Sequence, residues 1–353
     1  MITRLGRVSY RREYYYDKEE RAGEYPLDQQ LGITSELSRG VKRQLVKLSA
    51  RMPYQTAAEV FAELAQVQVG TTTAWEQTQE AGEHVRAMPE PIATVTAPSQ
   101  ERVACMGTTM DGCMVNVREE GWKEMKLGCV FEVSTSGAST SNKQGETIPV
   151  VKAEAQSYVL HLGSPEGFAV KLAVETQARG WHAALQSAVI GDGAAWIWNL
   201  ANHDYTNSAH IVDWYHAKQH LYSAAQIVCS NQPDQVAQWV EQHADLLYTG
   251  HADQIAARMM GLAASAQSDA KSKLQTEAGY FSANHQRMQY RDFQLAALPI
   301  GSGTVESGAK QTKQRVSAAG MRWSRRGLEN LLPLRAALMS NAFDTLWKTI
   351  CPF

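Results

Sequence analysis

Two strand-like segments that each lead straight into a helix constrain the fold of this chain more than any other feature of its sequence. SAVIG ends at position 191 and is followed by Asp192 and the helical pattern AAWIWNLA. AHIV ends at position 212 and is followed by Asp213 and the helical pattern AKQHLYSAAQIV. Before them come the β-rich runs RVACMGTTMDGCMVNV and WKEMKLGCVFEVS, the polar loop STSGASTSNKQGET, and two short apolar runs at 157–162 and 167–174. A strand meander followed by strand–helix alternation predicts an α/β fold in which helices pack on a mixed sheet.

Helical patterns flank and interrupt this sheet. Residues 36–88 read as three short helices, which fit either a helix-turn-helix-like DNA-binding region or a plain three-helix bundle. Residues 233–297 are rich in Ala and Gln and predict an all-helical insertion. The predicted domains, in chain order, are an N-terminal strand and loop segment (1–35), a helical region (36–90), the first part of the core (100–230), the helical insertion (231–298) and the last part of the core with the C-terminal helices (299–353).

The composition is that of an ordinary globular protein. Apolar residues make up 44% and charged residues 20% of the chain, and the net charge of −2 gives no overall nucleic-acid signature. The five cysteines form no CxxC pair, which argues against a disulfide framework and a Cys-only zinc site. The sequence holds no signal peptide and no apolar run long enough to span a membrane. We therefore expect a soluble protein of the cytoplasm.

Three acidic residues stand where a shared site is expected. Asp111 follows a strand-like run, Asp192 follows SAVIG, and Glu306 opens the helix in IGSGTVESGAKQTKQRV. The strand ends of an α/β sheet gather side chains into one crevice, and carboxylates are preferred ligands of Mg²⁺. Each acid also has a simpler interpretation: a hairpin turn for Asp111, a helix N-cap for Asp192, and compensation of the helix dipole for Glu306. Taken together with the neighbouring glycines, the three acids predict a divalent-metal site.

A second polar cluster, DWYHAKQH, places Asp213, His216 and His220 on one face of a helix. The HxxxH spacing is that of a helical zinc site, but the fuller H-E-x-x-H signature is absent. The alternative, which we favour, is that Asp213 and His216 orient the metal ligands through hydrogen bonds. His220 is then an ordinary polar residue.

Two groups of basic residues offer local contacts to DNA phosphates, although the whole chain is close to neutral. One group follows Glu306, and the other lies near the start of the helical region. The predicted phosphate contacts are Lys310, Lys313, Arg315, Arg322, Lys42 and Arg43. Such contacts are sensitive to salt and largely independent of DNA sequence.

Four motifs, GDGAAWIWNLA, IVDWYHAKQHL, IGSGTVESGAKQTKQRV and GMRWS, in this order, resemble the ISKra4 group of bacterial insertion-sequence transposases. That group belongs to the DDE class, which has an RNase H-like catalytic core. The resemblance covers roughly residues 102–340 and implies that Asp111, Asp192 and Glu306 form the catalytic, metal-binding triad. Asp213 and His216 fall in a motif that lies beside the site in related superfamilies. The chain departs from the pattern near its start, where the paired cysteines that follow the aromatic run in relatives are absent.

The leading hypothesis is therefore a DDE transposase that hydrolyses DNA phosphodiesters at the ends of its insertion sequence and transfers the strands to target DNA. Mg²⁺ is the expected cofactor, with Mn²⁺ as a substitute. The expected partners are the terminal inverted repeats, target DNA and at least one further copy of the chain on DNA, with no membrane partner. A protein with these partners is expected to be associated with the nucleoid. The alternatives are a metal-dependent nuclease of the same fold, a non-catalytic DNA-binding protein derived from a transposase, and a hydrolase with zinc at His216 and His220.

Overall fold

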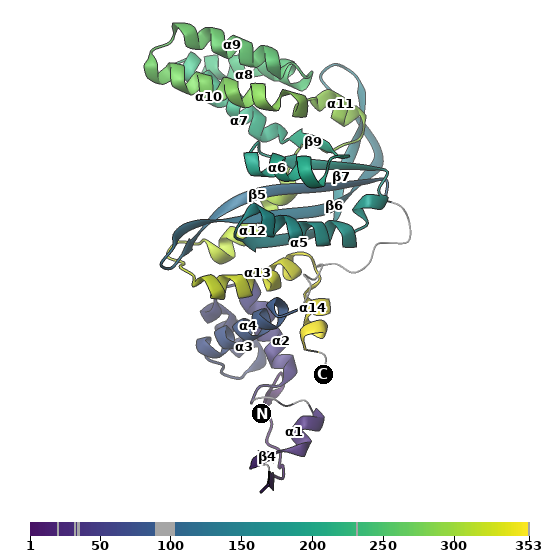
Figure 1. Ribbon diagram of the computed structural model, residues 1–353, viewed down its shortest axis with the longest axis vertical. Coiled ribbons are helices and arrows are strands. Elements are labelled where there is room, and N and C mark those ends of the chain that lie inside the picture. The colour runs from purple at the N-terminus through teal and green to yellow at the C-terminus, as the bar shows by residue number, and fades with distance from the viewer. Residues whose placement is uncertain (20, 32, 34–35, 89–102, 231, 352–353) are drawn as a thin grey trace.

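A five-stranded mixed sheet forms the centre of the computed structural model, which describes residues 1–353 except 20, 32, 34–35, 89–102, 231 and 352–353 (Figure 1). Its strands are β5 (Cys105–Val117), β6 (Gly121–Ser141), β7 (Thr147–Leu162), β8 (Gln186–Gly191) and β9 (Ala209–Val212). The order across the sheet is β7-β6-β5-β8-β9. β5, β6 and β7 pair antiparallel, whereas β8 runs parallel to both β5 and β9. The predicted α/β fold with a mixed sheet is confirmed.

The rest of the described chain holds short strands and helices. The short strands near the N-terminus pair as β1 (Ile2–Thr3) with β2 (Gly6–Arg7) and β3 (Tyr15–Asp17) with β4 (Ala22–Glu24). The α-helices are α1 (Pro26–Leu31), α2 (Arg39–Arg51), α3 (Tyr54–Ala65), α4 (Thr71–Arg86), α5 (Pro165–Ala178), α6 (Ala195–Asp204), α7 (Trp214–Val228), α8 (Pro233–Tyr248), α9 (Ala252–Ser265), α10 (Ser268–Asn284), α11 (Tyr290–Leu295), α12 (Gly303–Val316), α13 (Arg325–Met339) and α14 (Phe343–Ile350). Within the described part of the chain, no helix is both long and apolar enough to cross a membrane.

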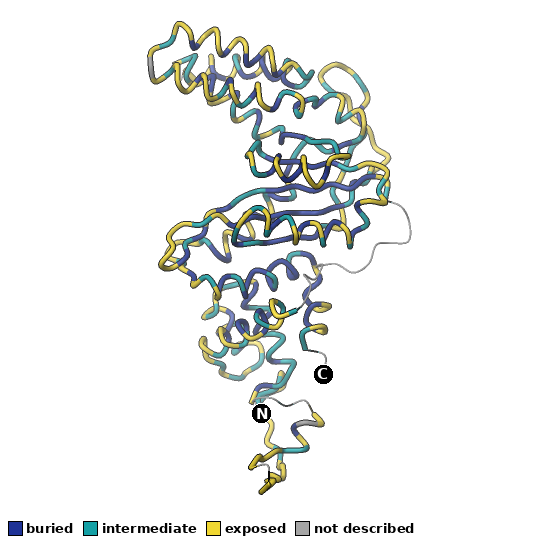
Figure 2. The backbone as a smooth tube through the Cα atoms, viewed as in Figure 1, coloured by how far each residue is buried: buried dark blue, intermediate teal, exposed yellow. Residues whose placement is uncertain are grey.

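The central strands β5 and β8 are buried because helices cover both faces of the sheet (Figure 2). Gly128 of β6 faces α5, since a Cβ at this position would lie 3.0 Å from Cζ of Phe168. The next residue, Cys129, points to the opposite face, where its partner Tyr158 lies against Gly308 of α12. The sheet therefore separates α5 on one face from α12 on the other.

The helical segment between β9 and α12 is tied to the sheet by the β6–β7 hairpin. α7 packs against α8 and α10, and the hairpin extends alongside these helices to reach α11 (Figure 1). At the hairpin tip, Glu146 forms an ion pair with Arg291 of α11, and Asn142 donates a 3.2 Å hydrogen bond to Tyr248 of α8. These contacts hold the insertion against the same sheet that carries the candidate site.

The N-terminal helices and the C-terminal helices share one hydrophobic cluster, although some 250 residues separate them along the chain. α2 and α4 both pack against α13, on the side away from the insertion (Figure 1). The members of this cluster are Val46, Ala50, Ala81, Leu334, Ala337, Leu338, Phe343, Leu346 and Trp347. Helices α2 and α4 are therefore packed directly onto the last part of the core.

α4 is the helix that a helix-turn-helix arrangement would insert into DNA, and its surroundings do not suit that role. It packs against α2, α3 and α13. Its exposed side carries Glu76 and Glu80, whose charges repel phosphate. These observations favour the plain-bundle alternative for this region.

Candidate functional site

Three aspartates lie at one level of the sheet. Thr109 of β5, Ile190 of β8 and Ile211 of β9 are partners across these parallel strands. Two positions further along each strand direction stands an aspartate: Asp111, Asp192 and Asp213. Because neighbouring strands lie about 4.8 Å apart, this register brings the three residues close together at the carboxyl ends of β8 and β9. Glu306 reaches the same place from the first turn of α12, which packs on β5.

Asp111 lies inside β5, where it pairs with Leu127, so the hairpin-turn interpretation is wrong for this residue. Its Oδ1 accepts a 2.7 Å hydrogen bond from the Gly112 N–H. The pKa of Asp111 is raised, first by burial and further by the negative charge of Asp192, whereas the positive charge of Lys313 lowers it. These effects place Asp111 within electrostatic reach of both side chains.

Asp192 follows β8 directly and shapes the turn into α6. Its Oδ1 accepts a 2.9 Å hydrogen bond from the Ala194 N–H, just before α6 begins. The simpler interpretation of Asp192 as a helix-start residue therefore holds in part. Its backbone carbonyl accepts a 3.0 Å hydrogen bond from the hydroxyl of Tyr280 in α10.

Asp213 is fully buried and links three segments that carry site residues. Its Oδ1 accepts a hydrogen bond from the His216 N–H at 2.8 Å, and its Oδ2 accepts one from the Ser302 N–H at 2.5 Å. Its own N–H donates to the Gly191 carbonyl at 2.8 Å. Burial acts to raise the pKa of Asp213, but the hydrogen bonds from His216 and Ser302 outweigh it, so the pKa lies below its usual value. Asp213 thus fixes the end of β8, the start of α7 and the entry to α12 relative to one another.

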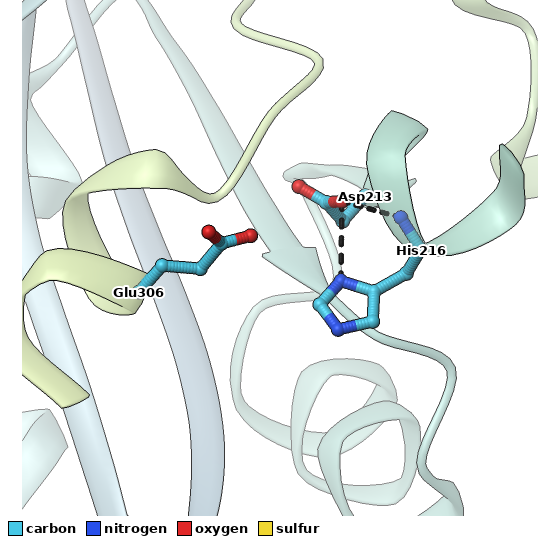
Figure 3. Close-up of side chains that lie close together, drawn as sticks. All are labelled: Asp213, His216 and Glu306. Carbon is cyan, nitrogen blue, oxygen red and sulfur yellow. Dashed lines mark hydrogen bonds and ion pairs between the residues drawn. The ribbon is translucent and has the colours of Figure 1, made fainter. Parts of the chain in front are cut away.

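His216 and Glu306 face each other beside Asp213, as Figure 3 shows. Within the described residues, Asp213, His216 and Glu306 form a group whose potential ligand atoms all lie within 4.8 Å of one another. Nδ1 of His216 is 3.1 Å from Asp213 Oδ1, which leaves Nε2 as the ring nitrogen that can bind a metal ion. The hydrogen bond to Asp213 raises the pKa of His216 against the effect of burial, and the charges of Asp192 and Glu306 raise it further.

The site suits a hard divalent cation by its chemistry. Glu306, Asp111 and Asp192 supply carboxylate oxygens, which Mg²⁺ and Mn²⁺ prefer. Asp213 is less suited to direct binding because both of its oxygens already accept backbone hydrogen bonds. Asp111 and Asp192 are not part of the close group around His216, although their charges act on that group.

His220 lies apart from this group and has partners of its own. Its Nδ1 is 2.6 Å from Oε2 of Glu277 in α10, and its ring stacks on Tyr280 with 3.5 Å between the ring centroids. Within the described residues, His220 does not join His216 in a metal-binding group. This placement favours the ordinary polar role for His220 over a zinc site.

The predicted phosphate contacts on and after α12 differ in exposure. Lys310, Lys313 and Arg322 are exposed. Arg315 is only 1% exposed, and its Nε donates a 2.7 Å hydrogen bond to the Ser49 carbonyl. A side chain held in this way inside the core does not meet phosphate from solvent, so the interpretation of Arg315 as a DNA contact is corrected to a structural role.

The predicted contacts in α2 are engaged in ion pairs within the chain. Arg43 lies 2.5 Å from Oδ1 of Asp344 in α14, and Lys42 lies 4.0 Å from Oε2 of Glu80 in α4. A phosphate at this surface would have to compete with both acids. The exposed lysines of α12 are therefore the better placed phosphate contacts.

Two residues of the site were not predicted from the sequence. Tyr280 belongs to the helical insertion and contacts a residue 88 positions away, and no spacing in the sequence indicates this. Ser302 contacts Asp213 across 89 positions, and its only signal is its place between two glycines in the IGSG motif.

Comparison with known proteins gives a family and a distant structural likeness. No curated protein matches the chain. A solved structure described as the Drosophila P element transposase strand transfer complex is 9% identical, with 90% of this chain and 81% of that chain covered and a TM-score of 0.31. A TM-score this low carries no argument about fold or function. The family model described as Uncharacterised protein family (UPF0236) matches residues 1–345, and the chain belongs to that family.

Proposed function

We propose that this chain is a DDE transposase of the ISKra4 group, which hydrolyses DNA phosphodiesters at the ends of its insertion sequence and transfers the strands to target DNA. The observation that carries the proposal is the position of Asp111 and Asp192 at one level of neighbouring parallel strands, with Glu306 directed to the same edge from α12. The sequence motifs around these residues support the same assignment.

The topology supports an RNase H-like core. An antiparallel meander of β7, β6 and β5 continues into the parallel strands β8 and β9, with helices on both faces. This is the arrangement expected from the sequence resemblance. The helical segment α8–α11 precedes the Glu306 helix, as the proposed domain order requires.

Asp111, Asp192 and Glu306 would hold Mg²⁺, or Mn²⁺ as a substitute, and His216 would add Nε2 as a further ligand. When bound, the ion supplies Lewis-acid stabilisation to a phosphodiester under attack by water or a 3′-hydroxyl. Asp213 holds His216 in a fixed tautomer through Nδ1 and keeps the start of α12 in place.

Exposed basic residues on and after α12 would orient the DNA. Lys313 lies close enough to Asp111 to lower its pKa, so a phosphate bound by Lys313 would lie near the acids. Lys310 and Arg322 would extend this contact along the backbone of the DNA. Joining two element ends requires at least two copies of the chain on DNA.

The test uses labelled oligonucleotides that carry the element ends, together with a target plasmid and Mg²⁺ or Mn²⁺. The proposal predicts cleavage at the ends and labelled product joined to the plasmid, both lost in Asp192→Asn while end binding is retained. Cleavage without joining would instead identify a metal-dependent nuclease of the same fold. End binding without any cleavage would identify a non-catalytic DNA-binding protein.

A further inference from the structure

Helix α10 of the insertion touches the turn that carries Asp192. The hydroxyl of Tyr280 donates a 3.0 Å hydrogen bond to the Asp192 carbonyl. The next residue, Gly193, has a φ of +107°, and a Cβ there would lie 2.5 Å from Cε2 of Tyr280. The tyrosine therefore fixes this turn in two ways, through a hydrogen bond and through the space that its ring occupies.

Tyr280 is itself held from the side of α7. The ring of His220 stacks on it at an interplanar angle of 19°, and Nδ1 of His220 lies 2.6 Å from Oε2 of Glu277. Glu277 and Tyr280 are three residues apart on α10, so one helix face holds both the ring and the partner of the histidine. His220 lies on the helix whose first turn carries His216.

The hydroxyl of Tyr280 is the donor in the hydrogen bond to the Asp192 carbonyl. Burial raises the pKa of Tyr280, and the charges of Asp192, Asp213 and Glu277 raise it further, which favours the protonated phenol that donates this bond.

We infer that Tyr280 is a positioning residue for the proposed reaction, which holds the Asp192–Gly193 turn so that Asp192 stays at the same level of the sheet as Asp111. The helical insertion is then a structural part of the active site. The expected effect of Tyr280 on DNA cleavage rests on the proposed function. The fixing of the Asp192–Gly193 turn by Tyr280 does not depend on that function.

The test compares Tyr280→Phe, which keeps the ring and removes the hydroxyl, with Tyr290→Phe. Tyr290 is a matched control because its buried hydroxyl has no hydrogen-bond partner among the described residues. Hydrogen exchange is followed by mass spectrometry in the peptide that covers residues 190–196. Loss of one hydrogen bond predicts about 5-fold faster exchange there in Tyr280→Phe and no change in Tyr290→Phe.

The same variants are assayed for cleavage and end binding in Mn²⁺. Tyr280→Phe is expected to lower kcat roughly 10-fold or more and to raise the half-saturating Mn²⁺ concentration, with end binding unchanged. Exchange in Tyr280→Phe equal to that in wild type would overturn the inference. If wild-type protein cuts no DNA, the proposed function fails, and the exchange measurement still decides whether Tyr280 positions the turn.

Discussion

Replacing Asp213 with Asn is the sharpest test of how the site is held together. The side chain is fully buried and accepts hydrogen bonds from two backbone N–H groups, one at His216 and one at Ser302. An amide of the same size has one oxygen, so its NH₂ group must face one of these two donors. The substitution therefore removes one hydrogen bond to a charged group and leaves one buried N–H without an acceptor.

The expected cost follows from these two losses. A hydrogen bond to a charged group contributes about 1.5–3 kcal/mol, and an unsatisfied buried donor costs about 1–3 kcal/mol. Together they predict that Asp213→Asn lowers the free energy of unfolding by about 2.5–6 kcal/mol at neutral pH. Because the pKa of Asp213 is lowered in the folded chain, this contribution is present above the ordinary pKa of 3.8 and is lost as the pH falls through the folded-state pKa. The difference between wild type and variant should therefore shrink in acid.

The assay is urea unfolding followed by tryptophan fluorescence, with Asp344→Asn as the matched control. Asp344 makes ion pairs with Arg43 and Lys47, but its side chain is 52% exposed, so its loss should change stability by less than about 1 kcal/mol. If Asp213→Asn costs no more than Asp344→Asn, the role of Asp213 as the link between α7 and α12 is refuted.

Three further predictions concern pH, DNA and metal. Burial, helped by neighbouring Lys and Arg charges, lowers the pKa of His161 to about 4. Below pH 6.5 the unfolded chain therefore takes up a proton that the folded chain does not. The free energy of unfolding should fall by about 3 kcal/mol between pH 6.5 and 4 for this reason. Urea titrations of His161→Gln should show a smaller fall. Lys313→Met should weaken DNA binding and reduce the slope of log binding constant against log salt concentration by about 1. Arg315→Ala should leave that slope unchanged and lower the free energy of unfolding by about 2–4 kcal/mol. Equal slopes in both variants would contradict the structural role of the buried Arg315. Mn²⁺ at about 100 times its Kd should stabilise wild type by about 2.7 kcal/mol and raise its Tm, and Glu306→Gln should lose most of this shift.

Local patterns were sufficient to predict the segments that carry the site. The strand–helix units around Asp192 and Asp213 have clear periodicity and neighbouring glycines, so their strands and helices could be predicted from the sequence. The buried face of α12 also had a signal, because Val305, Ala309, Thr312 and Val316 form a helical stripe that passes beside Arg315. The prediction that Arg315 contacts DNA used only the basic charges of this segment and not its apolar periodicity.

Contacts between distant segments could not be predicted in this way. Arg315 meets Ser49 across 266 residues, and Tyr280 meets Asp192 across 88. Such contacts depend on how the insertion and the N-terminal helices pack, which periodicity does not specify. The sequence predicted that Asp213 makes hydrogen bonds within the candidate site, and its partner Ser302 became clear only from the folded chain.

In the proposed function, Asp111, Asp192 and Glu306 act as one unit in metal-dependent DNA cleavage. The most direct measurement is the cleavage rate of a labelled element-end duplex in Mn²⁺ by Asp192→Asn, Glu306→Gln and the double variant, with end binding measured in parallel. We predict that each single variant loses at least about 10³-fold in cleavage rate with end binding retained, and that the double variant is no slower than either single variant. Wild-type cleavage rates in either single variant would contradict the assignment of the three acids as one catalytic unit.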